Sequence, residues 1–236
     1  MRVNHAVVLA AGKGTRLENL FGEKPKCLIE LNGKTLLERT LEKLHNVHFT
    51  NINIVVGYKK EQVIDHVRNL GYSKVNFVEN DYFTDRGSMY SLTKAYSFIK
   101  NSTWVFDADL YFDERIFEQI SNLDIDSTFL SKHSGSMDET IPIFIQGQFQ
   151  EFKKVDHNEN PEMLGITLLR EKTIQLMSEI DALHGYKLSY ESALSKAIFQ
   201  NALPLNLLYI PEYVWSDLDN KNDLARMMKI LSEHEN

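Results

Sequence analysis

The chain passes from a short apolar segment, Val7-Val8-Leu9-Ala10-Ala11, directly into Gly12-Lys13-Gly14-Thr15-Arg16, and Lys24-Pro25-Lys26 follows shortly afterwards. The apolar residues predict a buried strand that delivers the chain to a glycine loop. Small residues in such a loop let backbone N–H groups approach phosphate oxygens, while lysine and arginine supply countercharge. The segment therefore predicts a binding site for a nucleoside triphosphate.

This glycine loop differs from the two commonest phosphate-binding motifs. Position 17 is Leu, so the third glycine of the dinucleotide fingerprint is missing, and the Gly-Lys-Ser/Thr ending of a P-loop is missing as well. A glycine pair after a strand could, taken alone, be only a tight strand-to-helix turn. Arg16 and the spaced Lys24-Pro25-Lys26 make the phosphate-binding interpretation much more specific.

The composition favours one large globular domain over residues 1–236. Hydrophobic side chains make up 43% of the 236 residues, which is enough to bury a full core. The net charge of -7 argues against a nucleic-acid binder, which needs basic surface to displace counterions. Cys27 is the single cysteine, and no apolar run is long enough to span a bilayer. We therefore expect a cytoplasmic protein without membrane insertion.

Apolar runs rich in β-branched residues alternate with segments of helical period, which predicts successive βαβ units around a mostly parallel, mixed sheet. The expected fold class is α/β, a Rossmann-like three-layer αβα arrangement. The strands expected in this part are 5–9, 52–56, 75–78 and 104–106, and the helices are 36–45, 61–70, 88–99 and 114–120. Later, closely spaced strand-like runs predict a small antiparallel insertion. These runs are 129–131, 141–145, 149–155 and 166–169, and they precede helices at 171–180 and 190–199, a strand at 205–209 and a helix at 221–233.

Two pairs of acids follow predicted strands. Asp107 and Asp109 end the apolar run at Val105-Phe106, and ligands of open α/β sheets bind at the carboxyl ends of strands. Asp217 and Asp219 precede the last predicted helix. Magnesium favours one or two carboxylates plus phosphate oxygens and water, so both pairs are candidate ligands. In each case the alternative is an acid that only caps the following helix, and for Asp217 that reading has equal weight.

The stretch from Leu9 to Leu17, followed by Lys24-Pro25-Lys26-Cys27-Leu28, resembles the signature of the nucleotidyltransferases that activate sugar phosphates and phospho-alcohols. The resemblance implies the nucleotide-diphospho-sugar transferase type of fold, with Asp109 and Asp219 as Mg²⁺ ligands. It also implies that Lys26 reaches the α-phosphoryl region, while Arg16 and Lys13 meet the other phosphates. The residues that it assigns to the nucleotide are Leu9, Ala10, Ala11, Gly12, Gly14, Thr15, Gly57, Asn80, Ser88 and Asp107. Gly57 could equally be a turn, and Ser88 a helix cap.

Along its length the chain is most similar to compact bacterial cytidylyltransferases that act on phosphocholine and related small amino-phosphoryl compounds. This similarity implies CTP and a phosphorylated or phosphonate amino-alcohol as substrates. Ring faces and carboxylates that could meet a cationic head group are those of Tyr186, Tyr190, Glu191, Trp215 and Asp217, although such aromatics more often fill cores. Where choline-using members offer an aromatic, this chain has Asp138-Glu139-Thr140. A carboxylate suits a primary ammonium, so 2-aminoethylphosphonate or phosphoethanolamine is a serious alternative to phosphocholine.

Two other functions remain open on the sequence alone. A sugar-1-phosphate nucleotidylyltransferase uses the same triphosphate site. A catalytically silent regulatory homologue would keep the fold, but the joint presence of Arg16, Lys26, Asp109 and Asp219 argues against it. A homodimer is left open as the oligomeric state.

Overall fold

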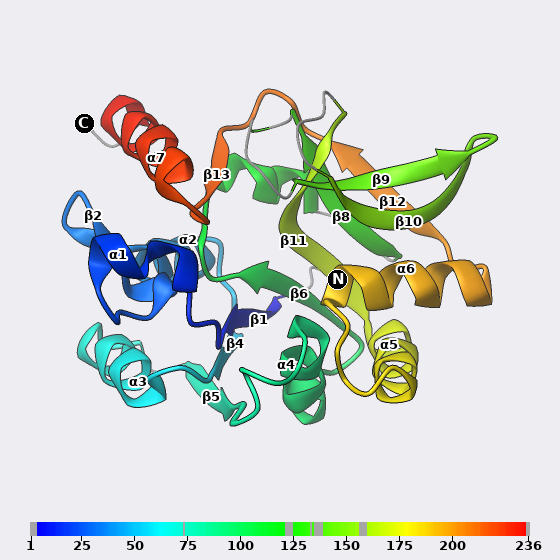
Figure 1. Cartoon of the computed structure of the whole chain (residues 1–236), viewed down its shortest axis with the longest axis horizontal. Coiled ribbons are helices and arrows are strands. Elements are labelled where there is room, and N and C mark those ends of the chain that lie inside the picture. The colour runs from blue at the N-terminus through cyan, green and yellow to red at the C-terminus, as the bar shows by residue number, and fades with distance from the viewer. Residues whose placement is uncertain are drawn as a thin grey trace.

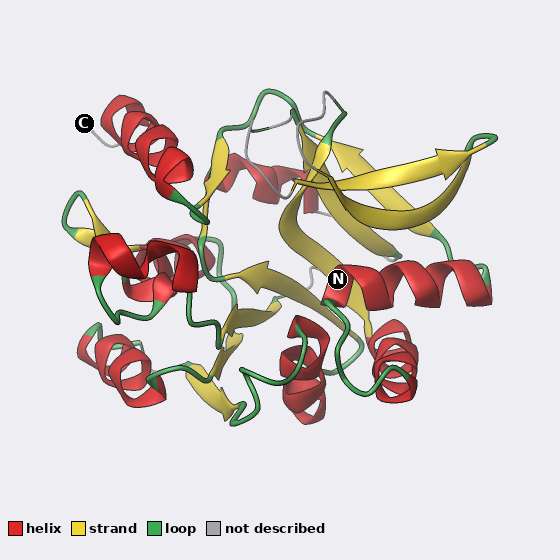
Figure 2. Ribbon diagram, viewed as in Figure 1, coloured by secondary structure: helices red, strands yellow, loops and turns green. Residues whose placement is uncertain are grey.

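The main element of the structure is a seven-stranded, mostly parallel sheet (Figures 1 and 2). The computed structural model describes residues 4–72, 74–120, 125–132, 134, 139–155 and 160–234. The sheet strands are β1 (His5–Ala10), β4 (Asn51–Val56), β5 (Val75–Glu79), β6 (Ser102–Asp107), β8 (Asp126–Ser131), β11 (Glu162–Arg170) and β12 (Leu205–Tyr209), and their order is β12-β8-β11-β6-β1-β4-β5. β11 alone among them runs antiparallel to both its neighbours, β6 and β8.

Helices cover both faces of this sheet (Figure 2). α2 (Leu36–Asn46) and α3 (Lys60–Asn69) pack on one face, and α4 (Ser88–Ala95), α5 (Glu171–Leu183) and α6 (Tyr190–Asn201) pack on the other. Residues alternate along β1 as a strand requires: Ala6 and Val8 join the core under α2 and α3, whereas Val7 joins the core under α4 to α6. The predicted three-layer α/β fold is confirmed.

The shorter elements surround one edge of the sheet. The segment between β1 and α2 contains η1 (Thr15–Leu17), α1 (Glu18–Phe21), η2 (Lys26–Leu28), β2 (Glu30–Leu31) and β3 (Lys34–Thr35). β7 (Leu110–Phe112) pairs antiparallel with β13 (Trp215–Asp217), which leads to α7 (Lys221–His234). A third, smaller core, which includes Leu17, Ile29, Leu218 and Met227, joins α7 to the early segment. Two further 3₁₀ helices are η3 (Tyr96–Phe98) and η4 (Glu114–Ile120).

The expected antiparallel insertion is smaller than the sequence predicts. Two of its four strands, β8 and β11, belong to the main sheet, and only β9 (Glu139–Ile145) and β10 (Gln148–Val155) form a separate hairpin, which projects from the body (Figure 1). The difference has a physical cause. β8 and nearly all of β11 are buried on both faces, whereas β9 and β10 carry exposed residues. No helix of the described residues is long and apolar enough to cross a bilayer.

Candidate active site

The glycine loop and the first pair of acids meet where β1 and β6 end. The two strands are parallel neighbours, and their register places Leu9 opposite Asp107. The Ala108 N–H donates to the Leu9 carbonyl oxygen at 3.3 Å, which carries the contact just past the strand. The chain therefore leaves both strands at the same edge of the sheet, where α/β folds bind their ligands.

Gly14 lets the glycine loop and Lys26 approach each other closely. Its φ of 71° is left-handed, a conformation that glycine adopts without steric cost. A Cβ at this position would lie 2.7 Å from the Cβ of Lys26, so any side chain here would collide with the lysine stem. The second glycine of the loop thus sets the path of the lysine that follows twelve residues later in the sequence.

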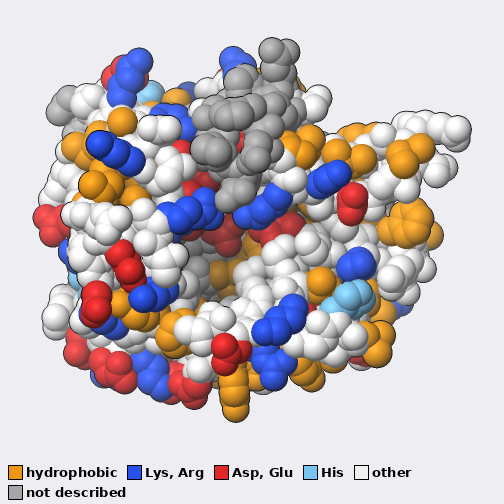
Figure 3. All heavy atoms as spheres, in the orientation of Figure 1, with side chains coloured by type: hydrophobic (Ala, Val, Ile, Leu, Met, Phe, Trp, Pro, Cys, Tyr) orange, Lys and Arg blue, Asp and Glu red, His pale blue; other side chains and the backbone are white. Residues whose placement is uncertain are grey.

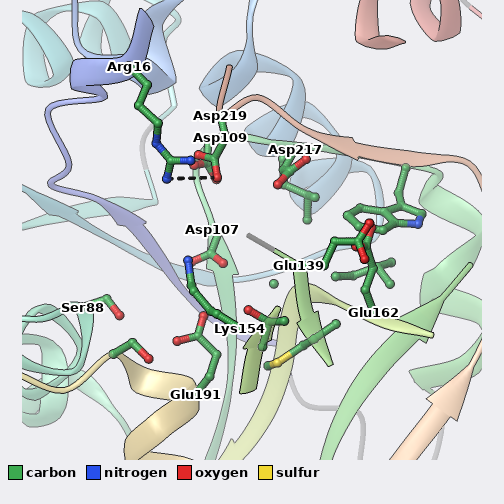
Figure 4. Close-up of a pocket in the computed structure, with 17 residues that line it drawn as sticks. Arg16, Ser88, Asp107, Asp109, Glu139, Lys154, Glu162, Glu191, Asp217 and Asp219 are labelled. Atoms are coloured by element: carbon green, nitrogen blue, oxygen red, sulfur yellow. Dashed lines mark ion pairs between the residues drawn. The ribbon is translucent and has the colours of Figure 1, made fainter. Parts of the chain in front are cut away.

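The Lys26 ammonium lies between two carboxylates from distant parts of the chain. Nζ donates to Oδ2 of Asp109 and to Oδ1 of Asp219, and Nη2 of Arg16 lies 3.5 Å from Oδ2 of Asp219 (Figure 4). Burial alone would lower the pKa of Lys26, but the two carboxylates outweigh it and raise this pKa. Burial would likewise raise the pKa of Asp219, yet Lys26 and then Arg16 hold it below its ordinary value. The cations Lys26 and Arg16 thus stabilise the charged form of Asp219.

Main-chain pairing brings Asp109 and Asp219 together. β7 starts directly after Asp109, and its antiparallel register with β13 places Leu110 opposite Asp217. Beyond β13, the carboxylate of Asp223 accepts hydrogen bonds from the N–H groups of Asp219 (2.9 Å) and Asn220 (3.0 Å). The second acid is consequently held from both sides, by the strand before it and by the first turn of α7 after it.

Asp109 and Asp219 fit a magnesium ion that shares phosphate oxygens. They converge on the one point that the Lys26 ammonium now contacts. Within the described residues no group of three or more His, Cys, Asp or Glu side chains could enclose a metal ion by itself. Two carboxylates completed by triphosphate oxygens and water are the donor set that Mg²⁺ prefers.

A cavity of about 280 Å³ opens beside this cluster and is hollowed into the molecular surface (Figures 3 and 4). Acids dominate its described lining. They are Asp107, Asp109, Glu139, Glu162, Glu191, Asp217 and Asp219, against the two basic residues Arg16 and Lys154. Lys154 reaches in from β10, and Trp215 adds an indole ring. Such a lining suits a ligand that carries positive charge as well as phosphate.

Burial, followed by repulsion from neighbouring acids, raises the pKa of several of these carboxyl groups. Burial, followed by repulsion from Asp109 and Glu191, raises the pKa of Asp107 well above its ordinary range. Burial, helped by Glu139 and Asp217, raises the pKa of Glu162 to about 8. An acid crowded in this way gains stability when a cation binds next to it.

Most of the predicted site residues gather here. Those that line the cavity are Arg16, Ser88, Asp107, Asp109, Glu191, Trp215, Asp217 and Asp219. A small adjoining hollow is lined by Leu9, Ala10, Gly12 and Lys26 together with Cys27, Ala108 and Asp109.

The remaining loop residues surround these. Lys13 pairs with Glu18 at 2.7 Å, and Thr15 is exposed at the start of η1. A Cβ on Gly57 would lie 2.9 Å from the Cβ of Ala11. The absence of a side chain at Gly57 therefore lets the loop after β4 pack closely against the start of the glycine loop.

Three further predicted binding residues, Tyr186, Tyr190 and Asn80, line neither the cavity nor the adjoining hollow. Tyr190 is 1% exposed and packs in the core under α6. Tyr186 faces Arg86 and Tyr90 instead. Asn80 is buried, and its amide stabilises a local turn by accepting from the N–H of Tyr82 and donating to Ser91 Oγ. Aromatic and amide side chains have packing and turn roles as well as binding roles, and the sequence pattern does not separate them. Asp138 lies outside the described residues.

The structure also brings in residues that the sequence did not single out. Glu139 and Glu162 lie together on the side of the cavity away from Arg16, while Lys154 points toward Asp107 (Figure 4). One sequence signal exists for the two glutamates, since each is a charged residue at the start of an otherwise largely apolar strand. Lys154 carries no such signal, because lysines on exposed hairpins are common.

Comparison with known proteins agrees with this geometry. Residues 6–147 match the MobA-like NTP transferase domain. The chain belongs to this family of nucleotidyltransferase enzymes. Sequence relatives include the bifunctional protein GlmU of Methanococcus maripaludis, 34% identical over 48% of this chain and 26% of that protein. Another is the choline-phosphate cytidylyltransferase of Streptococcus pneumoniae, 39% identical over 48% of this chain and 47% of that protein. The matches thus span between a quarter and a half of these relatives.

Solved structures extend the likeness over nearly the whole chain. The CTP:phosphocholine cytidylyltransferase LicC of Streptococcus pneumoniae superposes with a TM-score of 0.77 at 25% identity and covers 98% of this chain and 100% of LicC. The inositol-1-phosphate CTP transferase from T. maritima has a TM-score of 0.84 at 19% identity, over 99% of this chain and 96% of that one. At 19% identity, the likeness to the inositol-1-phosphate CTP transferase supports the fold only. The nucleotide-diphospho-sugar transferase type of fold is thereby confirmed.

Proposed function

We propose that the chain is a magnesium-dependent cytidylyltransferase that transfers CMP from CTP to a small amino-phosphoryl acceptor and releases pyrophosphate. The observation that carries the proposal is the position of Lys26, between Asp109 and Asp219 at the edge of an acidic cavity. CTP as the donor is supported by the likeness to LicC, a CTP:phosphocholine cytidylyltransferase. The cavity supports an acceptor with a positive charge.

The triphosphate half of the site is built from cations. Lys26 would contact the α-phosphoryl group, and Arg16 and Lys13 would contact the outer phosphates. Lys13 now pairs with Glu18 on the exposed side of the loop and would exchange that partner for phosphate. Asp109 and Asp219 would hold Mg²⁺, which neutralises charge on the triphosphate when bound.

The reaction needs no covalent intermediate on the protein. A phosphate or phosphonate oxygen of the acceptor attacks the α-phosphorus, one P–O bond forms, and the bond from the α-phosphorus to the bridging oxygen breaks. The electron pair of that bond leaves with pyrophosphate. Because the attacking oxygen is already anionic, no general base is required. The side chains contribute by placing the two substrates in line and by neutralising their charge.

The acceptor half of the site contains one described ammonium and several carboxylates. Lys154 would meet the acceptor's phosphate or phosphonate, because Arg16, the other basic residue of the described cavity lining, is assigned to the triphosphate. Glu139, Glu162 and Glu191 line the cavity where the acceptor's amine would lie. Carboxylates accept hydrogen bonds from a primary ammonium, which favours 2-aminoethylphosphonate or phosphoethanolamine, whereas the ring of Trp215 could face the methyl groups of phosphocholine.

A substrate matrix tests the proposal. Pyrophosphate release would be measured with CTP, UTP, GTP, ATP and dTTP against phosphocholine, phosphoethanolamine, 2-aminoethylphosphonate and glucose-1-phosphate, with and without Mg²⁺. We expect turnover with CTP and at least one amino-phosphoryl acceptor, dependent on Mg²⁺. Turnover of glucose-1-phosphate alone would instead make the chain a sugar-1-phosphate nucleotidylyltransferase, and no turnover with CTP would overturn the proposal.

A further inference from the structure

Arg86 forms a cluster with three tyrosines outside the cavity. It lies in the turn between β5 and α4, and its guanidinium carbon is 4.7 Å from the ring centre of Tyr186, 5.5 Å from Tyr90 and 5.8 Å from Tyr82. The rings meet edge to face, with centroids 5.3 Å apart for Tyr90 and Tyr186. The Nη1 atom of Arg86 also donates to the Gly185 carbonyl oxygen at 2.9 Å. A planar guanidinium can stack on rings and donate hydrogen bonds at once, which a lysine cannot do.

Main-chain hydrogen bonds also connect residues 82–90 with residues 185–190. We call these two segments together the clasp. The Gly87 N–H donates to the Tyr186 carbonyl oxygen at 2.9 Å, and the Met89 N–H to that of Leu188 at 3.2 Å. A Cβ on Gly87 would lie 1.9 Å from the Leu188 oxygen, so the two segments touch backbone to backbone. They therefore behave as one unit although about a hundred residues separate them.

The clasp ends at the cavity. The Tyr190 N–H donates to Oγ of Ser88 at 2.9 Å, which ties the first residue of α6 to the first residue of α4. Ser88, Ser189 and Glu191 all line the cavity, and Figure 4 shows Ser88 and Glu191 facing it from these two helix starts. Within the described residues, the buried Oε2 atom of Glu191 has no hydrogen-bond partner. The position of Glu191, the second residue of α6, therefore depends on where the helix begins, which the clasp helps to set.

We propose that Arg86 is a positioning residue for the acceptor, which fixes Glu191 in the cavity by holding residues 185–190 against residues 82–90. The proposal rests on the proposed function, in which Glu191 receives the acceptor's amine. Arg86 does not line the cavity itself, so its effect passes through the clasp. Loss of Arg86 leaves the segment before α6 held by its main-chain hydrogen bonds and by Asp181, so we expect this segment to loosen and Glu191 to shift relative to Lys154. The triphosphate half of the site, on the other side of Asp107, keeps its own supports.

The test separates the Michaelis constants of the two substrates. Steady-state pyrophosphate release would be measured with CTP and the best amino-phosphoryl acceptor for the wild type, Arg86→Ala and Arg86→Lys. In Arg86→Ala we expect the KM for the acceptor to rise about tenfold, because Glu191 is misplaced, while the KM for CTP stays within about twofold. Ser88, which we expect at the nucleotide, should keep its place, because the turn before it retains its own hydrogen bonds to Tyr82 and Asn80. The acceptor KM of Arg86→Lys should lie between those of the wild type and Arg86→Ala, because lysine keeps a cation over the rings.

Two further variants make the test specific. Arg68→Ala removes another arginine from an aromatic face, 5.9 Å from Phe77 and outside the site, and should leave both Michaelis constants unchanged. In a Glu191→Gln background, Arg86→Ala should add little to the acceptor KM, since both changes act through one contact. If Arg86→Ala does not fold, the same cycle would be run with Arg86→Lys.

Three results would overturn the proposal: an unchanged acceptor KM in Arg86→Ala, an equal rise in both KM values, or full additivity with Glu191→Gln. Each of these leaves the proposed function standing, because the wild type turns over in the same assay. A wild type that is inactive with every acceptor would instead overturn the proposed function, and this inference with it.

Discussion

At the scale of single residues, Lys26 links the candidate magnesium ligands to the candidate triphosphate site. Its ammonium is shared by Asp109 and Asp219, the same carboxylates that we assign to magnesium. Two acids held this close repel each other, and the shared cation offsets that repulsion. Lys26 therefore balances charge in the folded protein, and in the proposed reaction it would also act on the α-phosphoryl group of the nucleotide.

We expect Lys26→Ala to lower kcat by roughly a hundredfold or more, with a smaller change in the KM for CTP, because charge on the α-phosphoryl group grows as the reaction proceeds. Pyrophosphate release at saturating acceptor measures both constants. Lys34→Ala is the matched control, since Lys34 is an exposed lysine that pairs with Glu42 away from the site. Near-normal turnover in Lys26→Ala would contradict the role.

Asp219→Asn tests the second carboxylate while preserving the shape of the side chain. The amide removes one negative charge from the pair that would bind magnesium, so the Mg²⁺ concentration for half-maximal activity should rise by at least about tenfold. A magnesium titration of pyrophosphate release measures this value. Asp65→Asn, at an exposed position on α3, should titrate like the wild type. A titration curve for Asp219→Asn that overlays the wild type would remove this residue from the metal site.

At the scale of elements, the sequence predicted strands and helices well wherever period and burial agree. β1, β4 and α3 carry unmistakable apolar patterns and were expected within one or two residues of where they lie. What the sequence could not predict is which sheet a strand joins. β8 and β10 both read as strand-like runs, and only the tertiary partners place β8 inside the main sheet and β10 in the hairpin.

The close approach of the glycine loop to η2 is a second feature at the scale of elements, and a substitution at Gly14 tests it. Gly14 is left-handed, with φ 71° and ψ 41°, and Gly22 has φ 65° and ψ -160°, a conformation that essentially only glycine adopts, so alanine is strained at both positions. Only at Gly14 does the added Cβ meet Lys26; at Gly22 it meets open space. We therefore expect both Gly14→Ala and Gly22→Ala to lose thermal stability, but a large loss of kcat in Gly14→Ala alone. Equal activity in the two variants would show that the contact with Lys26 does not matter.

At the scale of the whole molecule, the cavity gathers acids from segments far apart in sequence. Glu139 comes from the hairpin, Glu162 from the start of β11 and Asp217 from β13. The sequence predicted Asp217 because it stands in a short acidic motif before a helix. It could not predict the two glutamates, because their meeting depends on the way the hairpin folds over the sheet. The electrostatic character of the acceptor site is thus a property of the fold.

This gathering of acids should make the folded protein less stable as the pH rises. Glu162 is buried, and that burial, with Glu139 and Asp217 nearby, raises its pKa from an ordinary 4.5 to about 8. Between these two values the folded protein keeps the proton while the unfolded chain releases it, so the free energy of unfolding falls with increasing pH. Each pKa unit corresponds to about 1.4 kcal/mol, which makes the total fall a few kcal/mol.

Glu162→Gln removes this titrating carboxyl group, so the free energy of unfolding should depend less on pH. Urea unfolding at about pH 5 and about pH 8 would compare the wild type, Glu162→Gln and Glu61→Gln, the last at an exposed position on α3. We expect the gap in unfolding free energy between the two pH values to shrink in Glu162→Gln and to stay unchanged in Glu61→Gln. Parallel behaviour of all three proteins would mean that Glu162 is ionised in the folded state, and that the cavity already compensates its charge without a bound cation.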